Sequence, residues 1–391
     1  MLTGDVLESA EFPDTVRTEW DALAIARARP FSAPAWMLAW WRHARPAHAV
    51  LRIVTVRRAG ELMGILPFFA ERVDRRLVRY RLLASMTAAH VEPLARVGHE
   101  REVAETAAAV LASDHVPADI LSLDGMSNAS PWPSLLGRHW PAADVWVHRS
   151  APMPAPRLSL AGRTYDEWFA GLSQRRRSEF RRRRRRLEER GAGVRLAESI
   201  AEARAGLRAF AALHYERWRA RGGSGVLDPQ IEAMLAEVAE ELLESERFRL
   251  WSIETEGRTI SSAIFLAAGG EASYWLGGFD ETWSAYGPAL ETVRAALEHA
   301  WKIGDRMIDF GPGGQRYKYM FADRQDFVGR VDLVPKSSRY LRARARLAPE
   351  HIWGDILAAR YEAFRRLPPG VQQRAKALRA ALHRWRARSS Q

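Results

Sequence analysis

The chain has 391 residues, a formal net charge of +12 and no cysteine. Its length suits two or three domains, and the lack of cysteine excludes disulfides, thiolate metal sites and a cysteine nucleophile. No apolar run approaches the roughly 20 residues that cross a bilayer, and the N-terminus lacks the basic and apolar regions of a signal peptide. We therefore expect a cytoplasmic protein. Its basic charge fits a polyanionic partner, although an arginine-rich composition is also what a GC-rich genome produces.

The first part of the chain predicts helices followed by a hairpin. Residues 1–45 read as helical, and Trp36, Trp40 and Trp41 have the helical spacing typical of a core. Residues 50–70 then read as two strands joined by a tight turn.

A polar loop after this hairpin contains a histidine and a carboxylate. His90 and Glu92 are two residues apart, so they could form an acid–base pair. A hydrogen-bonded loop histidine is the alternative. Both remain candidate substrate-binding residues.

A proline-rich stretch, residues 149–157, marks the strongest domain boundary in the composition. It divides an N-terminal domain, residues 1–150, from a second domain, residues 151–335. From residue 336 to 391 the pattern changes to basic amphipathic helices. Such helices can bind an anionic membrane or RNA, or they can pack on their own protein.

The second domain begins with a helix that is dense in arginine. Thr164 and Glu167 form a capping-box pattern, and the helix is expected to run to about Arg190. Nine arginines fall between Arg175 and Arg186. They are either a solvated face, a phosphate-binding surface or a contact for a nucleic-acid backbone.

The next helix, residues 200–221, places His214 and Trp218 four residues apart and hence on one face. His214 is either a core histidine or a base that faces substrate. Residues 248–254 and 259–268 follow, and they read as a hairpin that turns at a Glu-Gly pair.

Residues 274–321 hold the densest run of glycine, proline and aromatic residues in the sequence. A strand ending at Leu276 is followed by Gly277-Gly278, which we expect to form a turn. Gly287-Pro288 then starts an amphipathic helix. A helix N-terminus exposes unpaired N–H groups and partial positive charge, so it can bind a phosphate or pyrophosphate. A short buried strand, residues 307–310, precedes the loop Gly311-Pro312-Gly313-Gly314.

The sequence lacks the motifs of metal-dependent, phosphate-loop and serine-nucleophile enzymes. The sequence has no HExxH motif and no Walker phosphate loop, and no Gly-x-Ser-x-Gly elbow. We therefore expect no metal and no covalent intermediate on serine or cysteine.

Residues of about 165 to 335 resemble the CelD-like, or BioF2-like, acetyltransferase domain, a Fem-related branch of the GNAT superfamily. The resemblance rests on Phe210-x-x-x-His214-x-x-x-Trp218, Gly222-Gly223, Tyr274-Trp275, Asp280-x-x-Trp283, Gly287-Pro288, Gly304, Ile308-Asp309-Phe310-Gly311 and Tyr317-Lys318-x-x-Phe321. It extends to Phe31-Ser32-x-Pro34-x-Trp36 and Gly64-Ile65-Leu66-Pro67 near the N-terminus. One departure is the order Gly-Pro at the helix start, where Pro-Gly is expected.

The resemblance implies an α/β (α+β) fold with tandem GNAT-like domains, in which mixed sheets are flanked by helices. It also implies an acyltransferase that uses acyl-CoA, typically acetyl-CoA, and an amine, hydroxyl, sugar or peptide acceptor. The donor site would include Tyr274, Trp275, Gly278, Tyr286, Gly287 and Ala289. The acceptor site would include His90, Glu92, Trp218, Asp280, Trp283, Gly313 and Gln315. The catalytic candidates are Lys318, Asp309, Tyr317 and His214.

Among these candidates, the Lys318 cation could stabilise an oxyanion or an anionic leaving group. Asp309 could act as a base or anchor the glycine loop, and Tyr317 could donate a proton. Asp309 and Lys318 could equally form a structural ion pair.

Two other functions stay open. Aminoacyl-tRNA is the donor in Fem-like peptidyl transferases, and the arginines of residues 175–186 and the basic C-terminal helices fit tRNA or an anionic membrane surface. A non-catalytic protein that binds polyanions with a GNAT fold is the second alternative.

Overall fold

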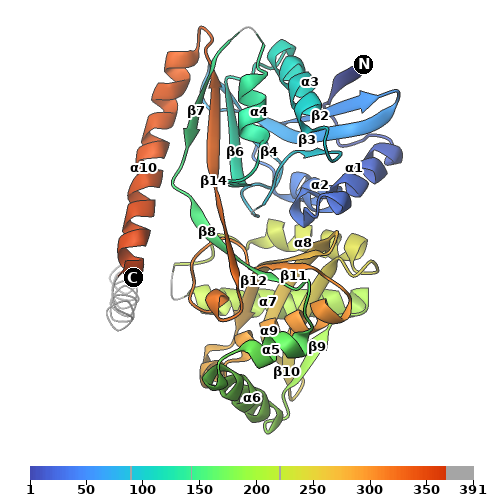
Figure 1. Ribbon diagram of the computed structural model, residues 1–391, viewed down its shortest axis with the longest axis vertical. Coiled ribbons are helices and arrows are strands. Elements are labelled where there is room, and N and C mark those ends of the chain that lie inside the picture. Colours follow the sequence, from blue (N-terminus) through green and yellow to red (C-terminus); the bar gives the residue numbers. More distant parts are fainter. Residues whose placement is uncertain (89, 142, 220–221, 367–391) are drawn as a thin grey trace. The chain divides into compact units, whose positions relative to one another are not determined.

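The computed structural model describes residues 1–88, 90–141, 143–219 and 222–366. Contacts divide the chain into two compact units (Figure 1). The first unit contains Met1–Arg157, Ala267–Glu271 and Asp309–Ile356. The second contains Leu158–Leu266, Ala272–Ile308 and, among the described residues, also 357–366. The boundary near residue 150 thus lies close to Arg157, but the C-terminal segment from Asp309 groups with the N-terminal unit.

The first unit is built on a sheet of strand order β1-β2-β3-β4-β6-β14. All neighbours whose pairing is resolved are antiparallel except β4 and β6, which are parallel. On its other edge β14 pairs with β8 and β7, and the short β5 pairs with β3. The strands are β1 Leu2–Leu7, β2 Val50–Arg58, β3 Glu61–Arg72, β4 Val78–Leu82, β5 Leu94–Ala95, β6 Ile120–Ser127, β7 Val145–Arg149, β8 Met153–Ser159 and β14 Arg324–Pro335.

Helices of the first unit cover this sheet. They are α1 Asp14–Ala26, α2 Pro34–Ala44, α3 Glu100–Ser113 and α4 Trp132–Arg138, with the 3-10 helix η1 at Pro30–Ser32. Trp36, Trp40 and Trp41 of α2 are buried, and the Trp40 ring lies 5.3 Å from Phe69 of β3. The prediction that these tryptophans form core is confirmed.

Two expectations for the first unit are wrong. Residues 1–45 are not all helical, because Leu2–Leu7 pairs with β2 as an edge strand. The tail is also not a separate domain over its first part. Helix α10, Tyr340–Arg366, buries Ala343 and Leu347 against Leu77 and Ile120. The second basic helix expected near residues 371–388 lies outside the described residues.

The second unit contains the strand order β13-β12-β11-β10-β9. These are β9 Gly193–Leu196, β10 Phe248–Thr255, β11 Arg258–Ala268, β12 Glu271–Phe279 and β13 Met307–Asp309. The tip between β11 and β12 and the end of β13 belong to the first unit. The helices are α5 Tyr165–Gly171, α6 Gln174–Glu188, α7 Ile200–Arg219, α8 Pro229–Leu242 and α9 Pro288–Lys302. Two 3-10 turns, η2 Glu281–Tyr286 in this unit and η3 Lys318–Met320 in the first, complete the chain.

The predicted capping box is present, since Thr164 accepts from the Glu167 N–H and the Glu167 carboxylate accepts from the Thr164 N–H. The single long helix expected after it is two helices. α5 ends at Gly171, and Ser173 caps a new helix, α6. The expected α/β architecture of sheets flanked by helices is confirmed. Among the described residues, none of the helices is both long and apolar enough to span a membrane.

Candidate functional site

The structure divides the predicted site residues between the two units. His90, Glu92, Asp309, Gly313, Gln315, Tyr317 and Lys318 belong to the first unit. His214, Trp218, Tyr274, Trp275, Gly278, Asp280, Trp283, Tyr286, Gly287 and Ala289 belong to the second. Each unit therefore carries its own group of candidate residues, and each group is built from local geometry.

The N-terminus of α9 is the clearest binding feature of the second unit. Gly287 caps it in the left-handed conformation with φ of 68°, and no side chain caps it. Pro288 occupies the first helical position, as the sequence predicted. A left-handed residue at this point suits glycine. Pro288 has no N–H, and the N–H groups of Leu290 and Glu291 donate to the Gly287 carbonyl at 3.2 and 3.3 Å. An anion at this end would therefore be held by the Ala289 N–H and by the helix dipole.

Arginines of α6 lie beside this helix start. A Cβ atom added to Gly287 would lie 3.1 Å from Cδ and Nε of Arg183. Arg186 donates through Nη1 to the Ala285 carbonyl at 3.2 Å. The guanidinium carbons of Arg186 and Arg190 each lie 4.5 Å from the centre of the Tyr286 ring. The α6 arginines and the α9 N-terminus, which the sequence presents separately, thus form one positively charged surface.

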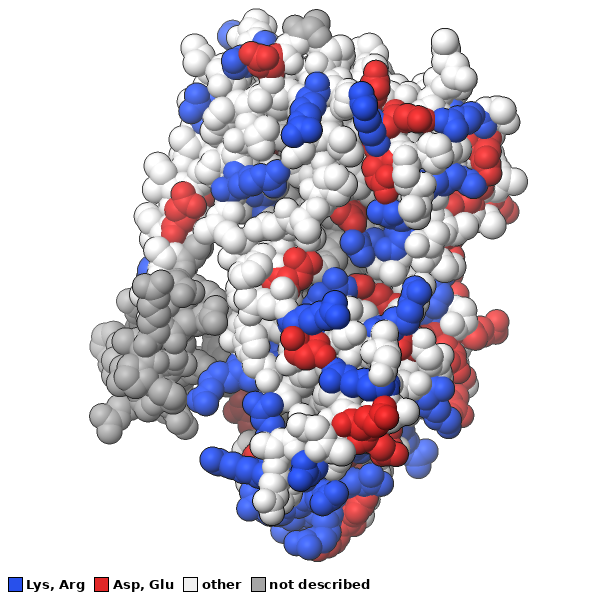
Figure 2. Space-filling view, viewed as in Figure 1, with Lys and Arg blue, Asp and Glu red and all other residues white. Residues whose placement is uncertain are grey.

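The remaining arginines of α6 differ in what they contact. Arg184 and Arg185 pair with Glu188 and Glu189 along the helix, whereas Arg175, Arg176 and Arg182 are exposed. Figure 2 shows the basic side chains gathered at the end of the molecule where Figure 1 places α6. Part of the arginine run is therefore a solvated face, and part lines the start of α9.

Gly277 and Gly278 do not form the expected turn. Both lie inside strand β12, which continues to Phe279. A Cβ atom on Gly278 would lie 3.3 Å from Cβ of Leu213 and 3.5 Å from the His214 nitrogen. The absence of a side chain at Gly278 lets α7 approach the strand closely, whereas a Cβ atom on Gly277 would meet the Tyr274 hydroxyl and the Ser262 carbonyl. These glycines therefore serve packing rather than chain reversal.

His214 lies in an aromatic group on the inner face of α7. Its ring is 6.0 Å from both Phe210 and Trp218, and Phe210 is 6.2 Å from Trp275 of β12. Nε2 of His214 lies 2.8 Å from the Ser224 hydroxyl. Burial, together with the Arg217 charge, lowers the pKa of His214. A neutral imidazole at physiological pH can accept a proton.

The structure gives Asp280 and Trp283 structural contacts. Asp280 caps η2 by accepting from the Thr282 N–H and hydroxyl and pairs with Arg258. Burial alone would raise the pKa of Asp280, but the hydrogen bonds from Thr282 outweigh burial, so the pKa is lowered. Trp283 and Tyr286 pack on a small apolar cluster that includes Leu187.

Two open grooves lie on the second unit. One, of about 1180 Å³, runs between α7 and β9–β10 and reaches Asp280. The other, of about 860 Å³, lies along α9 and includes Arg184 and Arg294. Gly287 lines neither groove. The candidate anion site at the start of α9 therefore rests on its backbone geometry and nearby charges, and not on a pocket.

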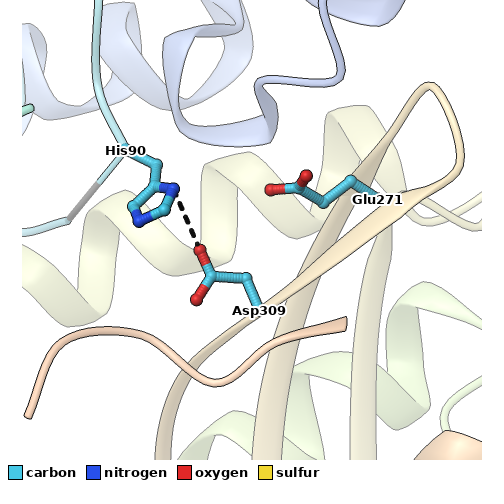
Figure 3. A group of neighbouring side chains, drawn as sticks. All are labelled: His90, Glu271 and Asp309. Carbon is cyan, nitrogen blue, oxygen red and sulfur yellow. Dashed lines mark ion pairs between the residues drawn. The ribbon is translucent and has the colours of Figure 1, made fainter. Parts of the chain in front are cut away.

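The first unit contains a buried histidine–carboxylate cluster. Nδ1 of His90 lies 3.3 Å from Oδ2 of Asp309, and Glu271 points its carboxylate toward the same place (Figure 3). One ligand atom from each of the three residues lies within 4.8 Å of the others. The exposed fraction is 4% for His90, 2% for Asp309 and 5% for Glu271, so the group is shielded from water. The sequence identified His90 and Asp309 but not their proximity, and it missed Glu271.

Arginines pair with one carboxylate of this cluster and with a carboxylate beside it. Arg157 pairs with Oε2 of Glu271. Arg29 donates to Oε1 of Glu92 at 2.6 Å, and the Ser130 hydroxyl donates to Oε2 of Glu92 at 2.7 Å. Glu92 is therefore bound by protein donors on both oxygens, which assigns it a structural contact rather than an acid–base role with His90.

Lys318 fixes the glycine loop. Its Nζ donates to the carbonyls of Gly311 at 2.9 Å and Pro312 at 2.7 Å. Gly313, with φ of 104°, donates its N–H to the Pro154 carbonyl at 2.7 Å, and the Gln315 amide packs against it. Burial lowers the pKa of Lys318 to about 8, while the negative charge of Asp309 acts in the opposite direction. These contacts anchor the loop, and a chemical role for Lys318 or Tyr317 stays a prediction.

The stability of the fold should rise with pH because of Lys318. Between its folded pKa of about 8 and its ordinary value of 10.5, the unfolded chain keeps the proton that the folded chain has lost. The unfolded state then binds more protons, so the free energy of unfolding rises through this window by up to about 3 kcal/mol. Urea denaturation at pH 7.5 and pH 10 measures this rise, and in Lys318→Met the rise should be smaller by this amount. An unchanged rise in the variant would show that Lys318 has an ordinary pKa.

Comparisons with known proteins agree with this fold. Residues 174–319 match the family model described as "Acetyltransferase (GNAT) domain". Three solved structures resemble most of the chain. FemX has a TM-score of 0.57 and 13% identity, and the match covers 84% of this chain and 96% of FemX. The C-terminal domain of a putative lysylphosphatidylglycerol synthetase from Agrobacterium fabrum has a TM-score of 0.54 and 10% identity, covering 87% and 95% of the two chains.

The third structure, a conserved protein of unknown function from Bacteroides thetaiotaomicron, has a TM-score of 0.54 and 8% identity, covering 85% of this chain and all of the other. At these identities the structures show a common fold. Comparison of the sequence with curated proteins gives no significant match.

Proposed function

We propose that this chain is an acyltransferase that uses acyl-CoA, because its residues 174–319 match the GNAT acetyltransferase domain model and its fold resembles that of FemX. The acyl group passes from the thioester directly to an amine or hydroxyl acceptor. The second unit carries the donor site, and no covalent intermediate on the enzyme is needed.

The observation that carries this proposal is the N-terminus of α9 together with the arginines of α6. Coenzyme A presents a pyrophosphate, and a pyrophosphate requires N–H donors and positive charge at close range. Gly287 keeps a side chain out of the space above the helix start. Arg183 and Arg186 add guanidinium groups beside it. Helix dipole, backbone donors and arginines therefore favour the same ligand.

The steps of the reaction follow from the bonds and protons that an acyl transfer must make and break. The acceptor nitrogen or oxygen attacks the thioester carbonyl and forms a tetrahedral oxyanion. The carbon–sulfur bond then breaks, and the thiolate of coenzyme A leaves with the electron pair. The acceptor must lose one proton, and the thiolate gains one. His214 fits the first role because it is buried and its lowered pKa keeps it neutral.

A second candidate donor is aminoacyl-tRNA, because part of α6 is an unoccupied basic surface. Arg175, Arg176 and Arg182 are exposed, and the first two lie about two helical turns before Arg183 in α6. Exposed arginines at this density suit a phosphodiester backbone. One structural neighbour is named as a lysylphosphatidylglycerol synthetase, and its name is compatible with an aminoacyl donor.

Titration calorimetry separates the two donors. Purified protein is titrated with acetyl-CoA and, separately, with aminoacyl-tRNA and uncharged tRNA, at low and high salt. A matched variant, Arg175→Gln with Arg176→Gln and Arg182→Gln, removes the exposed charge and leaves Arg183 and Arg186 in place. We expect saturable acetyl-CoA binding that persists at high salt and in the variant.

Other outcomes would redirect the proposal. Binding of aminoacyl-tRNA in preference to uncharged tRNA, without acetyl-CoA binding, would favour the second donor. Binding of every RNA that falls steeply with salt and disappears in the variant, again without acetyl-CoA binding, would indicate phosphate neutralisation alone. The non-catalytic alternative would then stand.

A further inference from the structure

We propose that His90, Glu271 and Asp309 form a binding site for a divalent metal ion of the zinc type. The site lies within the first unit and is separate from the donor site proposed above. Its three ligands come from a loop, the start of β12 and the end of β13. They are far apart in sequence, so they do not form a recognisable metal-binding sequence motif.

The ligand atoms have suitable spacing. Zinc binds histidine nitrogen and carboxylate oxygen at about 2.0–2.2 Å in near-tetrahedral geometry, and such bonds place neighbouring ligand atoms roughly 3.3 Å apart. Nδ1 of His90 and Oδ2 of Asp309 are separated by 3.3 Å. The full set lies within 4.8 Å, so a small movement of Glu271 completes the site.

Unpartnered polar atoms point to a ligand at this place. Within the described part of the chain, neither ring nitrogen of His90 makes a hydrogen bond, although the side chain is 3% exposed. Oε1 of Glu271 is also buried without a hydrogen bond. Leaving such groups unsatisfied costs about 1–3 kcal/mol each. A cation that accepts their lone pairs would remove that cost.

The surroundings orient each carboxylate for this purpose. The Gly311 N–H donates to Oδ1 of Asp309 at 2.7 Å, which leaves Oδ2 facing His90. Arg157 holds Oε2 of Glu271, which leaves Oε1 free. Metal ligands are commonly fixed by such outer contacts. Each acidic ligand thus has one oxygen held by a protein donor, and its second oxygen faces His90 in Asp309 and is buried without a hydrogen bond in Glu271.

His90 is oriented in the same way. Its backbone has φ of 58°, a strained value for a residue with a side chain, and its N–H donates to the Gly125 carbonyl at 2.7 Å. With Nδ1 at the cluster, Nε2 lies 4.0 Å from Oδ2 of Asp326. A ligating histidine commonly donates its other N–H to a carboxylate, and a slight ring rotation would make this bond.

The charge balance permits a cation. Four carboxylates, Glu92, Glu271, Asp309 and Asp326, face three cations, Arg29, Arg157 and Lys318. The nitrogen ligand favours zinc-type ions over Mg²⁺ and Ca²⁺, which prefer oxygen.

The test measures metal binding without relying on activity. Full-length protein without an affinity tag is stripped with a chelator and dialysed against Zn²⁺ or Mg²⁺, and bound metal is counted by mass spectrometry. We expect one Zn²⁺ per chain and no comparable Mg²⁺ binding. His90→Gln, Glu271→Gln and Asp309→Asn should each weaken binding by at least ~100-fold, the upper end of losses seen for outer contacts.

A matched control uses an exposed pair of the same chemistry. His99 and Glu102 lie 3.4 Å apart on the surface of the first unit, so His99→Gln with Glu102→Gln should leave Zn²⁺ binding unchanged. Because a cluster variant may fail to fold for other reasons, Co²⁺ is added to wild-type protein. An intense visible spectrum that Zn²⁺ abolishes is expected. Lack of Zn²⁺ binding, equal binding of Mg²⁺, or full binding in all three folded variants would overturn the proposal.

Discussion

Replacing Gly269 with alanine should destabilise the first unit by roughly 2–5 kcal/mol. Gly269 forms the tip between β11 and β12 and has φ of 56°. A Cβ atom there would lie 1.9 Å from the Ile25 carbonyl oxygen and 3.2 Å from the Ala28 Cα. The left-handed backbone costs roughly 1–2 kcal/mol for alanine, and forcing backbone atoms apart adds about 1–3 kcal/mol.

Gly257→Ala is the matched control for Gly269→Ala. Gly257 sits in the other hairpin tip with φ of 71°, and no atom lies within 4 Å of its added Cβ. Its substitution should cost only the backbone term. The preceding Glu256, with φ of 51°, shows that a side chain is accommodated in that tip. Urea denaturation of the two variants gives both losses, and equal losses would show that the approach to Ile25 is not close.

The same contact explains how Glu271 reaches the buried cluster. The tip Ala267–Glu271 belongs to the first unit, where Gly269 packs against the end of α1. Glu271 follows two residues later and pairs with Arg157. A displaced tip would move this carboxylate, so a folded fraction of Gly269→Ala should also bind Zn²⁺ more weakly.

Replacing Gly287 with aspartate should weaken acetyl-CoA binding by about 10- to 100-fold relative to asparagine. The two side chains have the same shape, and both tolerate the left-handed conformation of this residue. Both also cap helices well. Aspartate alone places a negative charge where the pyrophosphate is proposed to bind, and it would pair with Arg183, whose Nε lies 3.1 Å from the added Cβ. The expected difference is about 1.4 to 2.7 kcal/mol in binding free energy.

Calorimetric Kd values for Gly287→Asp and Gly287→Asn test this prediction. Thermal unfolding of both variants serves as the control, because aspartate at a helix N-terminus should not reduce stability. Equal Kd values in two equally stable variants would place the pyrophosphate elsewhere and remove the main support for the donor site. The metal proposal would be unaffected, since its residues belong to the first unit.

Local chemistry made several elements predictable. The amphipathic pattern after Gly287-Pro288 gives α9, Pro288–Lys302, because helix periodicity and a proline start act over a few residues. The Glu256-Gly257 turn gives the hairpin of β10 and β11 for the same reason. Thr164 and Glu167 form the expected capping box. Among the candidate residues, the position of Gly287 at the start of α9 was predictable because it depends on the local backbone.

Residues whose environment comes from distant segments were misjudged. Gly277-Gly278 resembles a turn in sequence, yet neighbouring strands hold it in β12 and α7 packs on it. Leu2–Leu7 carries no strong strand pattern, and its pairing with β2 decides its conformation. Arg29 and Ser130 bind Glu92, which the sequence placed beside His90 only through proximity in the chain.

The sequence by itself indicated the resemblance to a GNAT acetyltransferase domain, which a family model matches over residues 174–319. It also indicated the mixed α/β architecture, the glycine–proline start of α9 and the arginine-rich helix. Each of these depends on residue type and on spacing within one or two turns. Only the tertiary structure decided that Arg183 and Arg186 lie at that helix start, and that His90, Glu271 and Asp309 converge. The reason is physical: the convergence results from sheet pairing and from the close approach of Gly269 to α1, and neither leaves a periodic signal in the chain.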